Sequence, residues 1–101
     1  KEEGTFKDGE LTEGKWYYDN GKLFEEGTFK DGYLNGEGKL YYDNGKLSGE
    51  GTFKDGLLNG EGKYYYKNGI LGIEGTFKDG KLVEGKEYDE NGNLIEEIRI
   101  D

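Results

Sequence analysis

The sequence predicts an all-β protein, an elongated antiparallel meander of stacked β-hairpins that forms one open layer. Three observations predict this fold. The hexapeptide Gly-Thr-Phe-Lys-Asp-Gly begins at Gly4, Gly27, Gly51 and Gly75, so one unit recurs every 23 or 24 residues, as in proteins that stack one supersecondary unit on itself. Gly supplies 20 of the 101 residues and Pro none. Aromatic residues reach 15% although hydrophobic residues reach only 31%, which suits a thin sheet better than a disordered chain or a compact globule.

Turn signals divide each unit into two strands. Asp-Gly and Asn-Gly pairs alternate at intervals of 11 to 13 residues, and both pairs readily take the positive φ angles that tight hairpin turns require. Thr, Phe, Tyr and Trp fill the intervals, as β-strand residues do. We therefore predict two strands per unit and about eight in total, over ~40 Å at a strand spacing of about 4.8 Å. The glycines expected in turns are Gly9, Gly21, Gly32, Gly45, Gly56, Gly69, Gly80 and Gly92.

Strand alternation assigns the side chains to two faces. In the second strand of unit two, Leu40 and Tyr42 share one face, whereas Lys39 and Tyr41 share the other. We expect the first face to be packed, because its glycines let rings lie flat over the backbone. It would hold Phe6, Phe29, Phe53, Phe77, Trp16, Leu40, Tyr64, Tyr18, Tyr42 and Tyr66. Tyr17, Tyr41, Tyr65 and Tyr88 recur on the lysine face, so partial aromatic cover of both faces stays open.

Leucines recur two residues after every turn, and such fixed positions predict anchors that fold each loop onto the sheet. They are Leu11, Leu34, Leu58 and Leu82 after Asp-Gly, and Leu23, Leu47, Leu71 and Leu94 after Asn-Gly. Residues 94–100 predict a closing strand, with Ile98 and Ile100 on one face. We expect one repeat domain over residues 1–101, with units at about 3–25, 26–49, 50–73 and 74–101, the last including the closing strand.

Composition excludes several classes of function. The chain lacks Cys and His, which removes disulfides, the commonest general base and the commonest transition-metal ligand. The net charge of −9 argues against a nucleic-acid backbone or an anionic membrane as partner. No apolar run approaches the roughly 20 residues of a membrane helix, and no signal peptide is visible. We expect a soluble segment of unknown location. Because the chain opens at Lys1 partway into a unit, we expect a piece of a larger protein.

Local motifs offer no chemistry. The Asp19-Asn20-Gly21 and Asp43-Asn44-Gly45 stretches lack the spaced oxygen ligands of a calcium loop, so we expect turns and no metal. The carboxylates alternate with lysines as solvated cross-strand pairs do. Every unit repeats them, unlike the residues of an active site. We expect no cofactor and no enzyme activity.

The stretch from Phe53 to Gly69, with Asp55-Gly56, Leu58, Asn59-Gly60, Gly62, Tyr66 and Asn68-Gly69, resembles a MORN repeat. The stretch from Phe29 to Gly45 matches equally well, and the Tyr-Tyr-Asp-Asn-Gly-Lys-Leu segments are similar to the variant repeats common in bacteria. The resemblance implies a MORN-type sheet of stacked hairpins and a scaffold for protein–protein contact. Units one and four lack the glycine that stands at Gly36 and Gly60, as atypical terminal repeats do.

A second resemblance rests on Gly14-Lys15-Trp16-Tyr17-Tyr18, which is similar to cell-wall-binding repeats that hold choline or glucan between aromatic side chains. Trp16 has no counterpart in the other units, so we favour the first resemblance. The functional hypothesis is a non-enzymatic scaffold that binds a protein partner. The alternative is a carbohydrate- or choline-binding module that uses the same aromatic residues, and a spacer without a ligand also stays open. The candidate contact residues are Trp16, Tyr17, Tyr18, Tyr41, Tyr42, Tyr65 and Tyr66.

Overall fold

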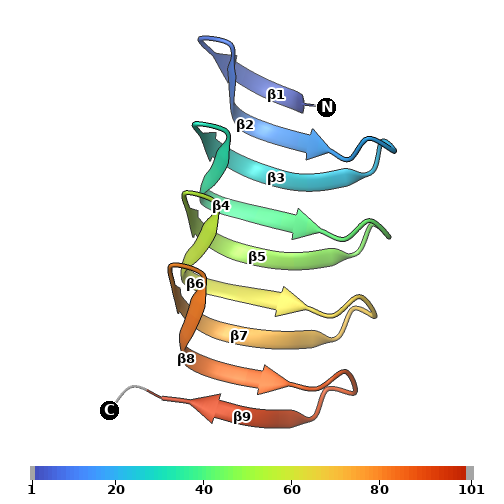
Figure 1. Cartoon of the computed structure of the whole chain (residues 1–101), viewed down its shortest axis with the longest axis vertical. Helices are drawn as coiled ribbons and strands as arrows, with labels where there is room; N and C mark the ends of the chain where they lie inside the picture. Colours follow the sequence, from blue (N-terminus) through green and yellow to red (C-terminus); the bar gives the residue numbers. More distant parts are fainter. Residues whose placement is uncertain (1, 100–101) are drawn as a thin grey trace.

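The computed structural model describes residues 2–99, and within them the chain forms a single nine-stranded antiparallel sheet (Figure 1). Neighbouring strands follow chain order without a crossover, which confirms the predicted meander. The ninth strand confirms the predicted closing strand, and Ile100 lies outside the described residues. The strands are β1 (Glu2–Lys7), β2 (Glu10–Tyr17), β3 (Leu23–Lys30), β4 (Tyr33–Tyr41), β5 (Leu47–Lys54), β6 (Leu57–Tyr65), β7 (Leu71–Lys78), β8 (Lys81–Tyr88) and β9 (Leu94–Ile98).

The sheet is long and thin. Its principal extents are 44 × 31 × 13 Å, and the longest agrees with the ~40 Å expected from strand spacing. The Cα radius of gyration is 14.5 Å, larger than the ~13 Å of a compact chain of this length. No described helix could serve as a membrane span.

The Asp-Gly turns are two-residue hairpin turns in which both residues have positive φ. Asp31 has φ 53° and Gly32 has φ 84°, and the other three turns repeat these angles closely. Such turns match the right-handed twist of the strands that they join. The hairpins also stack on one another, because Gly56 N–H donates to the Leu34 carbonyl at 2.9 Å and Gly80 N–H donates to the Leu58 carbonyl at 2.9 Å.

The Asn-Gly loops differ from the tight turns that the sequence predicts. Only their glycines have positive φ, for example Gly45 at 85°. Gly45 N–H donates to the Tyr42 carbonyl at 3.0 Å, and Tyr42 N–H donates to the Lys46 carbonyl at 2.9 Å. This is a three-residue loop with a left-handed third residue. The Asn44 carboxamide oxygen accepts from Lys46 N–H at 2.9 Å and so replaces a backbone turn, as Asn side chains do in Asx turns.

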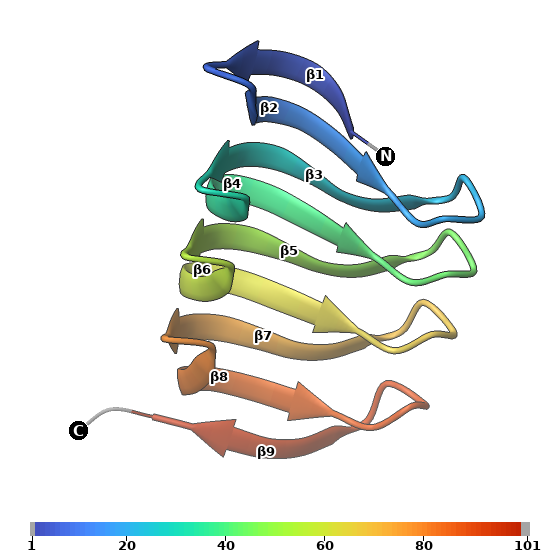
Figure 2. The same cartoon turned by 45° about the horizontal axis from the view of Figure 1, so that its top comes forward.

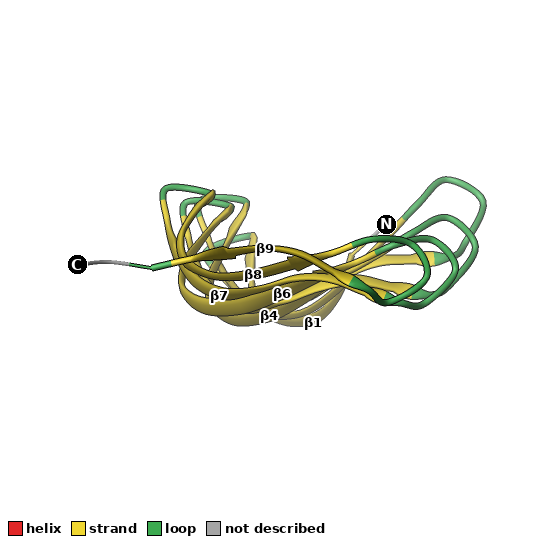
Figure 3. Cartoon of the chain, turned by 90° about the horizontal axis from the view of Figure 1, so that it is seen from below, coloured by secondary structure: helices red, strands yellow, loops and turns green. Residues whose placement is uncertain are grey.

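Each central unit bends sharply at a glycine that only these units possess. In β4, a Cβ on Gly38 would lie 2.8 Å from Cδ2 of Leu34, although four residues span about 13 Å in a straight strand. Gly36 lies between them with φ 113°, and Gly60 takes φ 123° at the same place in β6. The bend folds the Asp-Gly end of each hairpin back over the sheet (Figure 2). Seen along the stack, both rows of loops turn to the same side (Figure 3).

The hydrophobic core lies inside this bend. Its fully covered members are Leu11, Phe29, Leu34, Phe53, Leu58 and Phe77, and Trp16, Leu40, Tyr64, Ile73 and Leu82 pack against them. The predicted Phe/Leu face is therefore the packed one. Phe6 is an exception to that prediction, because it is 49% exposed. It lies on β1, at the edge of the sheet, with a neighbouring strand on one side only.

Candidate binding surface

The sheet face opposite the core carries two charged rows that run across the strands, with a row of bare glycine backbone between them, and we call it the open face. The central row consists of glycines that pair with one another from β1 to β8. Register pairs Gly14 with Gly27, Gly27 with Gly38 and Gly38 with Gly51, and continues in the same way. This glycine row comprises Gly4, Gly14, Gly27, Gly38, Gly51, Gly62, Gly75 and Gly85.

The glycine row is required by the backbone. Gly51 has φ 148°, and a Cβ there would lie 2.4 Å from the carbonyl oxygen of Glu61 on the paired strand. No other residue type accepts that combination of dihedral angle and approach. Gly62, opposite it, has no such φ but lies under Leu58 on the core side. The paired strands therefore meet without side chains in the middle of the sheet.

Two charged rows flank the glycine row. On one side Lys and Glu alternate from strand to strand, so that each Lys lies between two Glu neighbours. This lysine–glutamate row comprises Glu3, Lys15, Glu26, Lys39, Glu50, Lys63, Glu74, Lys86 and Glu97. Among residues 2–99, ion pairs join Lys67 to Asp43 and Arg99 to Glu97, and none joins two members of this row. The ammonium groups of the row are thus available to a partner.

On the other side Thr and Glu pair between successive units, as Glu13–Thr28, Glu37–Thr52 and Glu61–Thr76. We call this the threonine–glutamate row. The Thr52 hydroxyl donates to Oε1 of Glu37 at 3.0 Å, and the Thr76 hydroxyl donates to Oε1 of Glu61 at 3.0 Å. These bonds orient the carboxylates along the row, and each carboxylate still has a second oxygen that can accept.

The flanking rows and the bare glycine row enclose a shallow trough. Its two hollows measure about 490 Å³ each. Both are lined by Glu37, Glu50 and Gly51, so they adjoin at the middle of the sheet. The walls of the trough carry long side chains, whereas its floor is glycine backbone, and the Cβ positions of Gly38 and Gly62 face Leu34 and Leu58 on the core side.

The four tyrosines that the sequence places on the lysine face lie beside the lysine–glutamate row, and we call them the tyrosine ladder: Tyr17, Tyr41, Tyr65 and Tyr88. The Tyr41 hydroxyl donates to Oε1 of Glu26 at 2.5 Å, and the Tyr88 hydroxyl donates to Oε1 of Glu74 at 3.0 Å. Burial, the hydrogen bond to Glu26 and the nearby carboxylates raise the pKa of Tyr41 to about 12. At neutral pH Tyr41 therefore keeps its hydroxyl proton, and both Tyr41 and Tyr88 donate hydrogen bonds to the wall of the trough.

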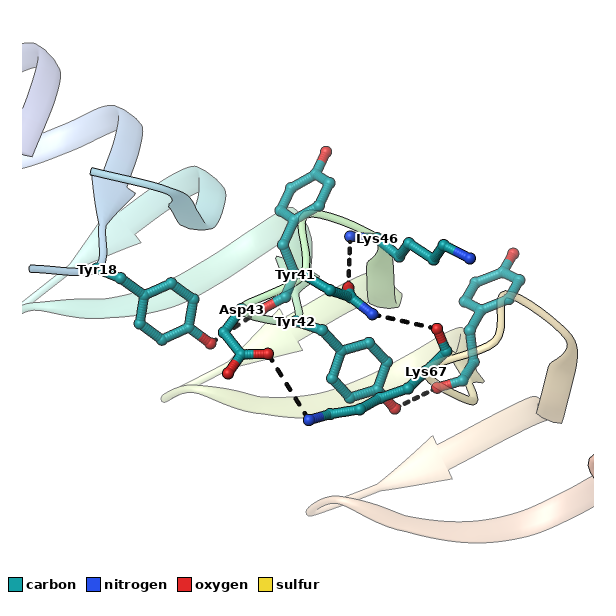
Figure 4. Close-up of polar contacts among 8 residues, drawn as sticks. Tyr18, Tyr41, Tyr42, Asp43, Lys46 and Lys67 are labelled. Atoms are coloured by element: carbon teal, nitrogen blue, oxygen red, sulfur yellow. Dashed lines mark hydrogen bonds and ion pairs between the residues drawn. The ribbon is translucent and has the colours of Figure 1, made fainter. Parts of the chain in front are cut away.

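The other tyrosine positions, Tyr18, Tyr42 and Tyr66, tie each unit to the next. The Tyr18 hydroxyl donates to the Tyr41 carbonyl at 3.1 Å, the Tyr42 hydroxyl donates to the Tyr65 carbonyl, and the Tyr66 hydroxyl donates to the Tyr88 carbonyl at 2.7 Å. Figure 4 shows Tyr18 and Tyr42 in this arrangement, with Lys67 crossing the Tyr42 ring and reaching Asp43 at 3.7 Å. These three side chains are half-buried, and their hydroxyls already have partners within the chain.

Trp16 lies on the core side, half-buried and packed against the hydrophobic cluster. Its cross-strand partners are Glu2 and Glu25, and burial raises the pKa of the Glu25 carboxyl group. The seven candidate contact residues therefore do not form one surface. Tyr17, Tyr41 and Tyr65 belong to the open face, whereas Trp16, Tyr18, Tyr42 and Tyr66 take part in packing or in ties between units.

The trough itself is the feature that sequence reasoning missed. The glycine positions and the Lys/Glu alternation are visible in the sequence. Their alignment into continuous rows depends on the register between units, which the loop lengths and bulges set. No group of three or more potential ligands for a metal ion occurs among residues 2–99.

Comparison with known proteins agrees with this architecture. The family model described as MORN repeat matches residues 50–70. The model described as MORN repeat variant matches residues 12–31, 34–55 and 80–100. No curated protein matches the chain. The variant repeat alone covers more than half of the sequence, and the nine-stranded sheet of stacked hairpins is the architecture that the repeat resemblance implies. The chain therefore belongs to the MORN-repeat family.

Proposed function

We propose that this chain is a non-enzymatic scaffold that binds a protein partner through its open face. The observation that carries the proposal is the contrast between the two faces. The core face is occupied by its own Phe and Leu side chains, whereas the open face presents the trough and charged rows with no ion pair between members of the lysine–glutamate row among residues 2–99.

The repetition of the open face favours binding over catalysis. Each unit presents the same Lys, Glu and Thr at the same positions, so the surface has no unique constellation of reacting groups. Stacked repeats use extended surfaces of this kind to contact partners. The tyrosine ladder adds aromatic residues, which are enriched at the energetic centres of protein interfaces.

Site-directed photo-crosslinking in cells of the source organism tests this proposal. A benzophenone amino acid replaces Thr28, which is exposed on the open face, or Tyr33, which is 59% exposed at the Asp-Gly end of β4. We expect a discrete protein adduct from the Thr28 position and none from Tyr33. Equal labelling from both positions, or none from either, would refute the proposal.

A glycan-binding module is the second candidate, because the tyrosine ladder places rings at regular intervals beside the trough. Titration with neutral oligosaccharides, followed by intrinsic fluorescence, separates the two functions. A saturable signal that Tyr41→Ala abolishes would support glycan binding, and an unchanged signal would leave the protein scaffold.

A further inference from the structure

The walls of the trough repeat with a fixed pitch. The wall carboxylates of the threonine–glutamate row come from alternate strands, with Glu13 on β2, Glu37 on β4 and Glu61 on β6, and Glu84 follows on β8. Strands lie about 4.8 Å apart, so these carboxylates recur every ~9.6 Å along the trough. The wall lysines Lys15, Lys39, Lys63 and Lys86 come from the same strands and share this pitch.

The trough is also acidic. Its two hollows are lined by six glutamates and four lysines, which gives a net charge of −2. The threonine–glutamate wall carries no cation, so its carboxylates face the trough without compensation from their own row. An occupant with positive charges at the wall pitch would complement this arrangement.

Peptide conformations differ in how well they fit that pitch. A polyproline II helix rises about 3.1 Å per residue with three residues per turn, so every third side chain recurs at ~9.3 Å on one edge. Over the three intervals from Glu13 to Glu84 the mismatch grows to only about 1 Å. In a β-strand, side chains on one face recur at about 6.7 Å or 13.4 Å, and neither spacing fits. In an α-helix two turns rise about 10.8 Å, which drifts by roughly 3.6 Å over the same intervals.

We propose that the trough binds a polyproline II segment with a Lys or Arg at every third position, lying along the long axis of the sheet. Each cationic side chain pairs with one carboxylate of the threonine–glutamate row. The backbone carbonyls of such a segment have no internal partners, and the wall lysines donate to them. The inference rests on the proposed protein-binding function and adds the class of partner.

Fluorescence anisotropy with two labelled 12-residue peptides tests the inference at about 50 mM salt, where exposed charges are only partly screened. One peptide is (Lys-Pro-Pro)₄. The other has the same composition, with its lysines alternately two and four residues apart. We expect the regular peptide to bind at least tenfold more tightly. Equal affinities would mean unspecific charge attraction and would overturn the inference, as would no binding of either peptide.

Paired variants locate the site. Glu37→Gln/Glu61→Gln removes two wall carboxylates and keeps the side-chain shape, and we expect it to abolish the preference for the regular peptide. Glu10→Gln/Glu90→Gln changes the net charge equally at two exposed residues outside the trough, and we expect the preference to persist. Loss in both variants would overturn the site. Binding of chitotetraose in place of either peptide would overturn the peptide as occupant. The crosslinking experiment detects any protein partner, so its outcome separates a wrong partner class from a wrong function.

Discussion

Leu58 and Leu57 are adjacent leucines with opposite environments, and truncating each to alanine tests how the bend stabilises the sheet. Leu58 is 0% exposed and Leu57 is 50% exposed. Cδ2 of Leu58 lies 2.8 Å from the Cβ position of Gly62 and 3.0 Å from that of Gly51. Leu58 therefore covers the glycine row from the core side, whereas Leu57 points outward over Gly80.

The expected loss is large because the surroundings cannot fill the void. Buried Leu→Ala substitutions destabilise by about 2.7–5.0 kcal/mol, and the loss rises with the volume of the remaining cavity. The glycines beneath Leu58 have no side chains to move into it, so we expect about 4 kcal/mol for Leu58→Ala. That is a large share of the roughly 5–15 kcal/mol of a typical domain. It corresponds to a fall in Tm of more than about 15 °C. For Leu57→Ala we expect at most about 1 kcal/mol.

A double variant sharpens this test. Gly62→Ala alone introduces a methyl group against Leu58, and such overpacking costs about 1–3 kcal/mol. In the Leu58→Ala background the same methyl group enters the void. The double variant should therefore lose about 0.5–3 kcal/mol less stability than the sum of the two single-variant losses. Urea unfolding followed by far-ultraviolet circular dichroism measures the unsubstituted chain, the three single variants and the double variant. Equal losses for Leu57→Ala and Leu58→Ala, or strict additivity with Gly62→Ala, would refute the bend.

Three further predictions concern other parts of the sheet. Tyr42→Phe removes the hydroxyl that donates to the Tyr65 carbonyl and should cost about 1 kcal/mol in urea unfolding, whereas Tyr33→Phe, at an exposed ring, should cost nothing measurable. Burial raises the folded-state pKa of Glu25. The stability that the protonated Glu25 side chain contributes is therefore fully present below its unfolded-state pKa and is lost as pH rises through its folded-state pKa. Glu25→Gln should therefore raise the Tm at pH 7 and lose that advantage near pH 4; a lower Tm at pH 7 would contradict it. Gly45 has φ 85° and open space at its Cβ position, so Gly45→Val should cost more than about 1 kcal/mol through backbone strain alone, and an unchanged Tm would show that the loop does not need a left-handed residue.

Local sequence signals predicted much of this fold. Asp31-Gly32 predicts a two-residue turn because both residue types accept positive φ. Leu34, two residues later, predicts an anchor, because an apolar residue that recurs at a fixed position after each turn is expected to pack against the sheet. The Phe/Leu face follows from strand alternation. Each of these inferences depends on neighbours within one hairpin, where sequence distance and spatial distance agree.

Features that depend on contacts between units were harder to predict. The sequence marks Gly36 only as a glycine that units one and four lack, yet it bends β4 so that Leu34 reaches Gly38. Tyr41 and Tyr42 are adjacent and chemically identical, but the Tyr41 hydroxyl donates to a carboxylate on the open face, whereas the Tyr42 hydroxyl donates to the backbone of the next unit. Only the register between units separates the two roles. The trough needs the same register, because a slip of one residue would move every wall side chain to the core face.

Cross-strand contacts in nuclear magnetic resonance spectra test the register between units most directly. The structure pairs Lys15 with Glu26 between units one and two, and Lys39 with Glu50 between units two and three. We predict nuclear Overhauser effects between the backbone protons of both pairs. Their absence, or effects that connect each Lys to a residue one place along the facing strand, would contradict the continuous rows and the trough between them.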